Sequence, residues 1–288
     1  DFAMDYIWYL WEGKDSPLFD KSKMATFERC FIEDKAVQKE EKGAYYTLRQ
    51  EEAICNMLLD NKIYNCDCLE AMKEIDDKSI DLIVCDLPYG CLNKKNPNAQ
   101  WDKPLPLNEL WEQYERIIKD DGAIVLFGQG MFTAKLMLSN EKLWRYNLVW
   151  KKGGRVSGFL NAKKQPLRNH EDILVFYKKQ PTYNPQMTIG KPLHGRGSGV
   201  HNLKNSNYGD FKEPEDTRKG ETLKYPKSVL NFERPHPAKH PTEKPVELLR
   251  WIIKTYSNEG DVVLDNCMGY GSTIIAAIEE NRRYIGIE

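Results

Sequence analysis

The residues best suited to chemistry follow directly on a short apolar run. Leu82 to Cys85 is rich in β-branched residues, which predicts a strand buried on both faces of a sheet, and Asp86, Leu87, Pro88 and Tyr89 come next. Ligands in open α/β sheets bind beyond the carboxyl ends of the strands, so these four residues are expected on the rim of a site. The proline stiffens the turn, which leaves a carboxylate and a flat ring to hold a planar, amine-bearing group. An ordinary strand-to-loop turn with a surface tyrosine is the alternative.

A second candidate site lies near the end of the chain. The expected strand 262–265 ends in Asp265, and a turn containing Gly269 and Gly271 opens a helix expected over 273–280. A last strand runs to Glu288. This order of strand, glycine turn, helix, strand and acidic residue is typical of a nucleotide-type binding unit. The glycines let a ligand approach the backbone, and the carboxylate can bind ribose hydroxyls.

Composition limits the classes of protein that need to be considered. The chain has 288 residues, a formal net charge of −1 and seven cysteines. No apolar run approaches the length of a bilayer span and no signal peptide opens the chain, which predicts a cytoplasmic protein with reduced thiols. The cysteines lack paired CxxC spacing, so no metal site is predicted.

The charge is unevenly distributed. Residues 1–60 carry 13 acidic and 8 basic groups, whereas residues 151–179 hold eight basic residues against two acidic ones. A basic stretch in a neutral protein is typical of a phosphate-binding face, and solvated lysines are the alternative.

The predicted elements alternate between strand and helix. Strands are expected at 62–64, 82–85, 123–127, 144–151 and 172–177, and helices at 107–119, 131–139 and 246–256. This alternation predicts a doubly wound sheet. Residues 180–235 lose periodicity and are rich in Pro, Gly, Asn and Lys, which favours a mobile insert or a binding-loop region.

Three motifs together resemble the circularly permuted β group of DNA amino-methyltransferases. They are Asp86-Leu-Pro-Tyr-Gly, His240-Pro-Thr-Glu-Lys-Pro and Asp265-Asn-Cys-Met-Gly-Tyr-Gly-Ser-Thr. The resemblance runs from Lys62 to Glu288. It implies a Rossmann-like doubly wound sheet of the S-adenosylmethionine-dependent methyltransferase type, with the helix and strand expected after Glu288 missing. A C-terminally truncated sheet of this kind would leave an uncovered edge.

The resemblance also implies a role for each matching residue. Asp86, the Leu87 carbonyl, Pro88 and Tyr89 would receive the target base. The S-adenosylmethionine site would be formed by Asp67, Cys68, Thr242, Lys244, Asp265, Cys267, Gly269, Gly271, Thr273 and Glu288. Phosphates of double-stranded DNA would meet Lys151, Lys152, Arg155, Lys163, Lys164 and Arg168.

The implied activity is methylation of the N6 amine of a flipped adenine, in a bacterial or phage restriction-modification setting. Asp in the first position of the tetrapeptide is the form usual for adenine enzymes of this kind. Methylation of cytosine N4 and an inactive DNA-binding remnant are the alternatives, and a homodimer is left open.

The first part of the chain resembles something else. The segments that begin at Trp8, Met24 and Tyr45 are similar to an internal piece of bacterial class III fructose-1,6-bisphosphatases, without their metal ligands. The predicted organisation is an N-terminal extension (1–61), a catalytic half (62–179), a target-recognition insert (180–235) and a cofactor-binding half (236–288).

Overall fold

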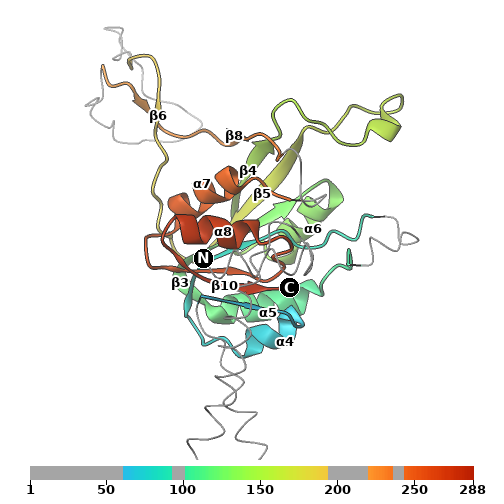
Figure 1. Cartoon of the computed structure of the whole chain (residues 1–288), viewed down its shortest axis with the longest axis vertical. Helices are drawn as coiled ribbons and strands as arrows, with labels where there is room; N and C mark the ends of the chain where they lie inside the picture. The colour runs from blue at the N-terminus through green and yellow to red at the C-terminus, as the bar shows by residue number, and fades with distance from the viewer. Residues whose placement is uncertain (1–60, 93–100, 194–219, 236–242) are drawn as a thin grey trace, which may run out of the picture. The chain divides into compact units, whose positions relative to one another are not determined.

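The computed structural model describes residues 61–92, 101–193, 220–235 and 243–288 (Figure 1). The chain divides into two compact units, and the smaller one is Pro185–Lys227. The larger unit comprises the described residues up to Asn184 and from Ser228 onward. Thr242 and the whole phosphatase-like segment up to residue 60 lie outside the described residues.

Eight strands of the larger unit form one sheet in the order β1-β10-β9-β2-β3-β5-β4-β8. The strands are β1 (Lys62–Tyr64), β2 (Ile80–Cys85), β3 (Ile118–Gly128), β4 (Trp144–Lys151), β5 (His170–Phe176), β8 (Val229–Asn231), β9 (Val262–Asp265) and β10 (Arg283–Ile287). The five strands from β1 to β3 are parallel, and β5 is antiparallel to both β3 and β4. The sheet is therefore doubly wound, as the alternating pattern predicts.

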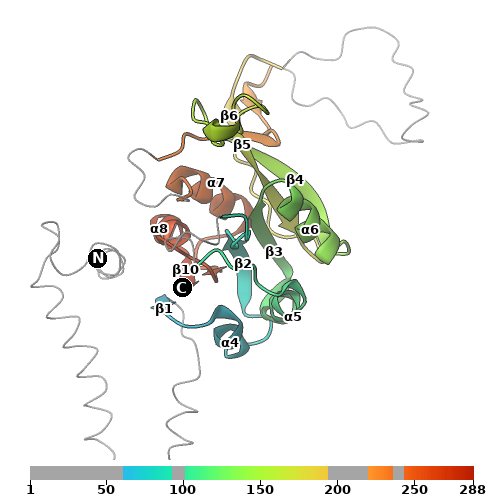
Figure 2. The ribbon, with the colours of Figure 1, turned by 90° about the vertical axis from the view of Figure 1, so that its right-hand side faces the viewer.

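Helices cover both faces of the sheet (Figure 2). They are α4 (Cys68–Lys73), α5 (Leu107–Ile117), α6 (Met131–Ser139), α7 (Val246–Tyr256) and α8 (Ser272–Glu279), with a short 3-10 helix η2 (Phe159–Asn161). Apolar side chains of α4, α5 and α6 pack on one face, and those of α7 and α8 pack on the other. Alternate residues of β2 serve the two cores, because Ile83 and Cys85 join the first cluster and Leu82 and Val84 join the second.

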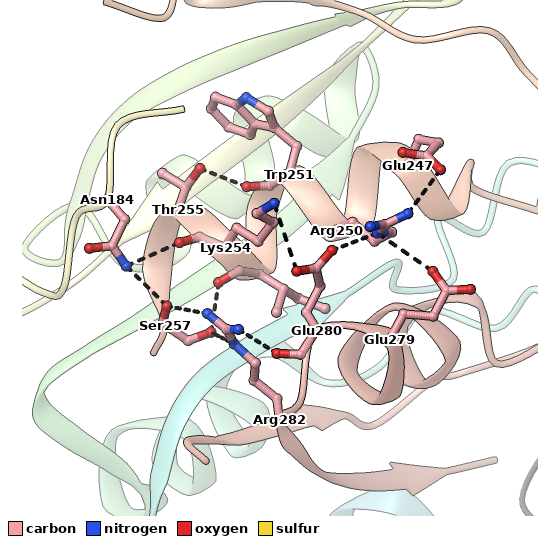
Figure 3. A network of polar contacts seen from close by, with 11 residues as sticks. Asn184, Glu247, Arg250, Trp251, Lys254, Thr255, Ser257, Glu279, Glu280 and Arg282 are labelled. Carbon is pink, nitrogen blue, oxygen red and sulfur yellow. Dashed lines mark hydrogen bonds and ion pairs between the residues drawn. The ribbon is translucent and has the colours of Figure 1, made fainter. Parts of the chain in front are cut away.

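Polar contacts fix α7 against α8 (Figure 3). Arg250 on α7 donates to Glu280 at 2.6 Å, and Arg282 donates to the Ser257 carbonyl oxygen at 2.7 Å. Asn184 donates to the same carbonyl oxygen at 3.1 Å. This network fixes the helix that follows Lys244 against the helix that follows the glycine turn, so two segments of the expected site are held in one framework.

Three of the differences between the sequence-based expectations and the structure have a clear cause. The helix expected over 107–119 ends at Ile117, because Ile118 begins β3 and pairs with Ile80 of β2; an irregularity follows, and the pairing resumes at Ala123. The strand β8, in the stretch expected to be irregular, pairs with β4. The expected uncovered edge at the last strand is wrong, because β10 lies between β9 and β1.

The smaller unit contains the two-stranded antiparallel sheet of β6 (Thr188–Ile189) and β7 (Leu223–Lys224). It lies within the predicted insert 180–235. None of the helices in the described ranges is long and apolar enough to cross a membrane.

Candidate active site

The site lies where the sheet changes winding direction. From β9 the chain passes through α8 to β10 on one side, whereas from β2 it passes through α5 to β3 on the other. β9 and β2 are neighbours, so the topological switch point falls between them. Ligands of doubly wound sheets bind beyond the carboxyl strand ends at this point. Asp265 ends β9 and Asp86 follows β2, so the two candidate motifs meet there.

The glycine turn after β9 has the features of a ligand cradle. Gly269 has a φ of +51° with open space where a Cβ would be, and Gly271 has a φ of +81° at the start of α8. Both conformations favour glycine. The Gly269 N–H donates to the Glu288 carboxylate at 2.7 Å. The backbone and the terminal acidic group of the predicted nucleotide-type unit are therefore brought together.

The neighbouring strand ends complete this half of the site. Glu288 exchanges backbone hydrogen bonds with β1 and the turn that follows it, to the Tyr64 oxygen at 2.9 Å and from the Cys66 N–H at 3.0 Å. Asp67 caps α4 by accepting from the Leu69 and Glu70 N–H groups at 2.9 and 3.1 Å. Segments from opposite ends of the described chain thus form one rim.

Asn266 organises the buried floor of this half, and the sequence analysis did not single it out. Its side-chain oxygen accepts from the Tyr114 hydroxyl at 2.6 Å, and its amide lies 3.7 Å from the Cys68 sulfur and 3.6 Å from the Cys267 sulfur. Asn266 is 1% exposed. An asparagine directly after an expected strand was the available signal.

Asp265 is buried behind this turn. Burial raises its pKa to about 7, although hydrogen bonds from Thr273 and the Cys267 N–H act in the opposite direction. The Cys85 thiol of β2 also acts to lower the pKa of Asp265, which connects the two halves of the site. Thr273 is likewise buried, at the start of α8.

A pH-dependent stability follows from the raised pKa of Asp265. Between about pH 4 and pH 7 the folded state keeps a proton on Asp265, whereas the unfolded state has released it. This group therefore stabilises the fold at low pH, and its contribution is lost as the pH rises through this range. Asp265→Asn is expected to remove this part of the pH dependence of unfolding free energy, worth up to about 4 kcal/mol. Denaturant unfolding across that range measures it, with Asp121→Asn as the control. If the unfolding free energy of Asp265→Asn depended on pH as it does in the wild type, the pH dependence could not be assigned to Asp265.

The other half of the site surrounds Asp86. One carboxylate oxygen accepts from the Tyr89 hydroxyl at 2.9 Å, and the other is paired with the Lys244 ammonium. Burial is the largest influence on the Asp86 carboxyl and raises its pKa, while Lys244 acts against that rise. The Tyr89 ring stacks on Phe132, with 4.7 Å between centroids and 28° between planes. The carboxylate and the ring are therefore held in place.

The turn around these residues is constrained on both sides. Leu87 is buried, and the Gly90 and Leu92 N–H groups both donate to the Asp102 carboxylate at 2.7 Å. Gly90 has a φ of +66°, and a Cβ there would meet Pro104 at 2.3 Å. Glycine is thus required directly after the Asp86–Tyr89 tetrapeptide.

Glu171 is the second residue that the sequence analysis missed. It lies near the start of β5, where it counted only as one of two acids in a basic stretch. Its carboxylate pairs with Lys152 at 2.5 Å and with Lys244 at 3.5 Å, and these two ammonium groups lower its pKa against the effect of burial. Asp86, Lys244, Glu171 and Lys152 form a row of alternating charges, called here the charge row.

Two members of the charge row have partners that the sequence did not predict. Lys152, expected on DNA phosphates, is 6% exposed and committed to Glu171. Lys244, expected at the methionine end of the cofactor, is drawn to the two carboxylates. The other basic residues, Lys151, Arg155, Lys163, Lys164 and Arg168, are exposed. Within the described ranges no group of three or more His, Cys, Asp or Glu is placed to hold a metal ion.

Solved structures share the architecture. The complex titled M1.HpyAVI-SAM matches with a TM-score of 0.50 and 22% identity, covering 79% of this chain and 92% of that one. The PvuII DNA methyltransferase, titled cytosine-N4-specific, matches with a TM-score of 0.54 and 15% identity over 81% and 83%. The fold is the Rossmann-like fold of S-adenosylmethionine-dependent methyltransferases.

A family model described as DNA methylase matches residues 80–288. The chain therefore belongs to this family of N6/N4 DNA methyltransferases.

The first part of the chain matches a different family. The model for Firmicute fructose-1,6-bisphosphatase covers residues 1–68. The class 3 fructose-1,6-bisphosphatase of Parabacteroides distasonis is 73% identical over 60 residues, and that of Bacteroides thetaiotaomicron is 68% identical over 60 residues. The chain spans 9% of the length of each of these relatives. The resemblance to a piece of such a phosphatase is confirmed.

Proposed function

We propose that this chain transfers a methyl group from S-adenosylmethionine to the N6 amine of an adenine extruded from double-stranded DNA. The observation that carries the proposal is the meeting of Asp86 and the glycine turn at the switch point of the sheet. This arrangement supports the binding of an amine by the carboxylate beside a ligand held in the glycine turn. S-adenosylmethionine supplies an electrophilic methyl group on a sulfonium.

The first half of the site suits this cofactor. The open space at Gly269 admits a ligand against the backbone, and the Glu288 carboxylate is an acceptor for ribose hydroxyls. Asp67 and Cys68 lie on the rim next to Glu288, as expected for the adenine end. The floor of this half and the start of α8 are formed by Asp265, Cys267, Gly271 and Thr273. Lys244, in the charge row, is proposed to lie towards the methionine end of the cofactor.

The second half suits an exocyclic amine. The amine is a weak nucleophile because its lone pair is delocalised into the ring. The Asp86 carboxylate and the Leu87 carbonyl accept its two N–H groups and draw the nitrogen towards tetrahedral geometry, and the same carboxylate is placed to take the proton that the nitrogen loses. Tyr89 stacks on the base, which must leave the duplex to reach this pocket. A carboxylate has lone pairs for the amine besides those used by Tyr89 and Lys244.

The choice between adenine and cytosine rests on Asp86. Aspartate at this position supports adenine N6, because it is the usual form in the adenine enzymes that the motif resembles. Cytosine N4 is the second candidate, because the matched family comprises both N6 and N4 methyltransferases. The proposed division of the chain keeps the extension 1–61, the halves 62–179 and 236–288, and the target-recognition insert 180–235, whose core is the separate unit 185–227.

The test is transfer of tritiated methyl groups from S-adenosylmethionine to unmethylated DNA, followed by nucleoside analysis. We expect N6-methyladenine. N4-methylcytosine would replace the adenine assignment with the second candidate. DNA retardation without any transfer would instead support the inactive DNA-binding remnant.

A further inference from the structure

The connection between β4 and β5 is an ordered projection, not a short hairpin turn. It runs from residue 152 to residue 169 and carries η2 at its far end (Figure 1). Ser157 and Arg168 exchange backbone hydrogen bonds at 2.8 and 3.1 Å, and the Lys152 N–H donates to the Asn169 oxygen at 2.8 Å. Backbone bonds within 158–165 close the tip. The projection, called here the β4–β5 arm, therefore presents its side chains from a defined backbone.

The tip of the arm exposes large apolar side chains. Phe159 is 73% exposed and Leu160 is 85% exposed, side by side in η2. Val156 and Leu167, on the two strands of the arm, are also exposed. Adjacent exposed apolar side chains on an ordered backbone are typical of contact with another molecule.

The charge of the arm indicates which kind of molecule. Residues 151–170 contain six Lys and Arg residues and no Asp or Glu. Arg155, Lys163, Lys164 and Arg168 are exposed around the tip. A cationic surface that surrounds an apolar tip is complementary to phosphates flanking a stack of bases.

The base of the arm adjoins the target-base pocket. Lys152 begins the arm, and Glu171 lies two residues after its end. Both residues belong to the charge row that reaches Asp86. Arg168 donates to the Gln129 side chain at 2.8 Å, beyond the carboxyl end of β3. Its charge also acts on Cys91, just past Tyr89. DNA that delivers a base to Asp86 therefore passes the arm.

We propose that Phe159 and Leu160 form a wedge that enters the base stack of the DNA and occupies the gap left by the extruded base. The inference rests on the proposed function. Extruding a base costs unstacking energy, and an inserted apolar side chain offsets that cost by restoring contact with the neighbouring bases. The wedge is a positioning device and takes no part in the chemistry.

The test compares two duplexes that contain the site methylated by the wild-type protein. In one the target base is paired, and in the other it faces an abasic position, which lowers the cost of extrusion. Phe159→Ser with Leu160→Ser is expected to reduce single-turnover methyl transfer on the paired duplex about tenfold or more, and to leave transfer on the abasic duplex close to wild type. Phe159→Leu keeps an apolar tip and is expected to retain most of the transfer on both.

Two controls make the result specific. Met131→Ser and Leu138→Ser remove apolar side chains that are 72% and 69% exposed on α6. Neither variant is expected to change the ratio of the methyl-transfer rates on the two duplexes. Equal loss on both duplexes, or no loss on either, would overturn the wedge while the proposed function stands. A change of oligomeric state in sedimentation, with the ratio unchanged, would assign the tip to contact between copies of the chain. If the wild-type protein methylates no DNA, both the proposed function and the role of the wedge are contradicted.

Discussion

Asp86→Asn is expected to reduce methyl transfer by at least about 100-fold while the protein stays folded. The amide has the shape of the carboxylate but only one acceptor oxygen and no negative charge. It neither holds the amine as strongly nor takes its proton. The loss is expected in the rate of transfer with bound substrates, because Asp86 belongs to the half of the site that would hold the base and not to the glycine turn that would hold the cofactor.

The control for Asp86→Asn lies in the strand that Asp86 follows. Asp81 lies near the amino end of β2, where it accepts from Lys119 at 2.6 Å and from the Val262 N–H at 2.9 Å. Asp81→Asn is expected to weaken the fold without removing transfer. Single-turnover assays with saturating S-adenosylmethionine compare the two variants. Asp86→Asn protein that keeps more than a tenth of the wild-type rate would exclude the proposed role.

Much of the fold could be predicted because its signals are local. The apolar runs at 82–85 and 262–265 are strands buried by helices on both faces, and such strands lack polar alternation. Asp67 caps its helix as its residue type predicts. The seven cysteines were predicted to be reduced, and each cysteine in the part of the chain that the structure describes is a free thiol.

The errors in the fold have non-local causes. Residues 120–122 have the composition of a turn, but they lie within β3, because Ile118 and Ala123 on either side of them both pair with β2. The three residues of β8 carry too little pattern to indicate a strand, and β4 supplies the partner. In both cases, pairing with a distant strand decides whether the residues form a strand. A short window of sequence does not show which strand the partner will be.

The candidate site shows the same division. Asp86, Tyr89, Gly269 and Gly271 could be found because each has a distinctive type at a strand end. Glu171 could not, because its importance comes from Lys244, far along the chain. Asn266 also follows a strand, but that position does not reveal its distant partner Tyr114. Lys152 was assigned to phosphates because neighbouring residues are basic, but only the structure shows which of these side chains is buried.

Lys244→Met is expected to destabilise the fold by about 3 to 5 kcal/mol at neutral pH. Lys244 is 8% exposed, and its ammonium lies between Asp86 and Glu171 and 5.0 Å from the centre of the Phe127 ring. Methionine fills similar space but leaves two buried carboxylates with less compensation, since Lys152 reaches only Glu171. The control is Lys254→Met on α7, which removes a half-exposed ammonium 3.8 Å from Glu280 and should cost less than about 1 kcal/mol.

The pH dependence separates this electrostatic cost from lost packing. Lys244 lowers the pKa of both carboxyls, so its removal raises both values and makes the folded state bind protons more readily than the unfolded state. The variant should therefore recover stability as the pH falls towards about 5. Adding Glu171→Gln to Lys244→Met should restore part of the loss at neutral pH, because it removes one uncompensated charge. Unfolding free energies from denaturant titration at each pH measure both effects. A deficit that stays constant with pH, and that Glu171→Gln does not reduce, would assign the cost to packing around Phe127.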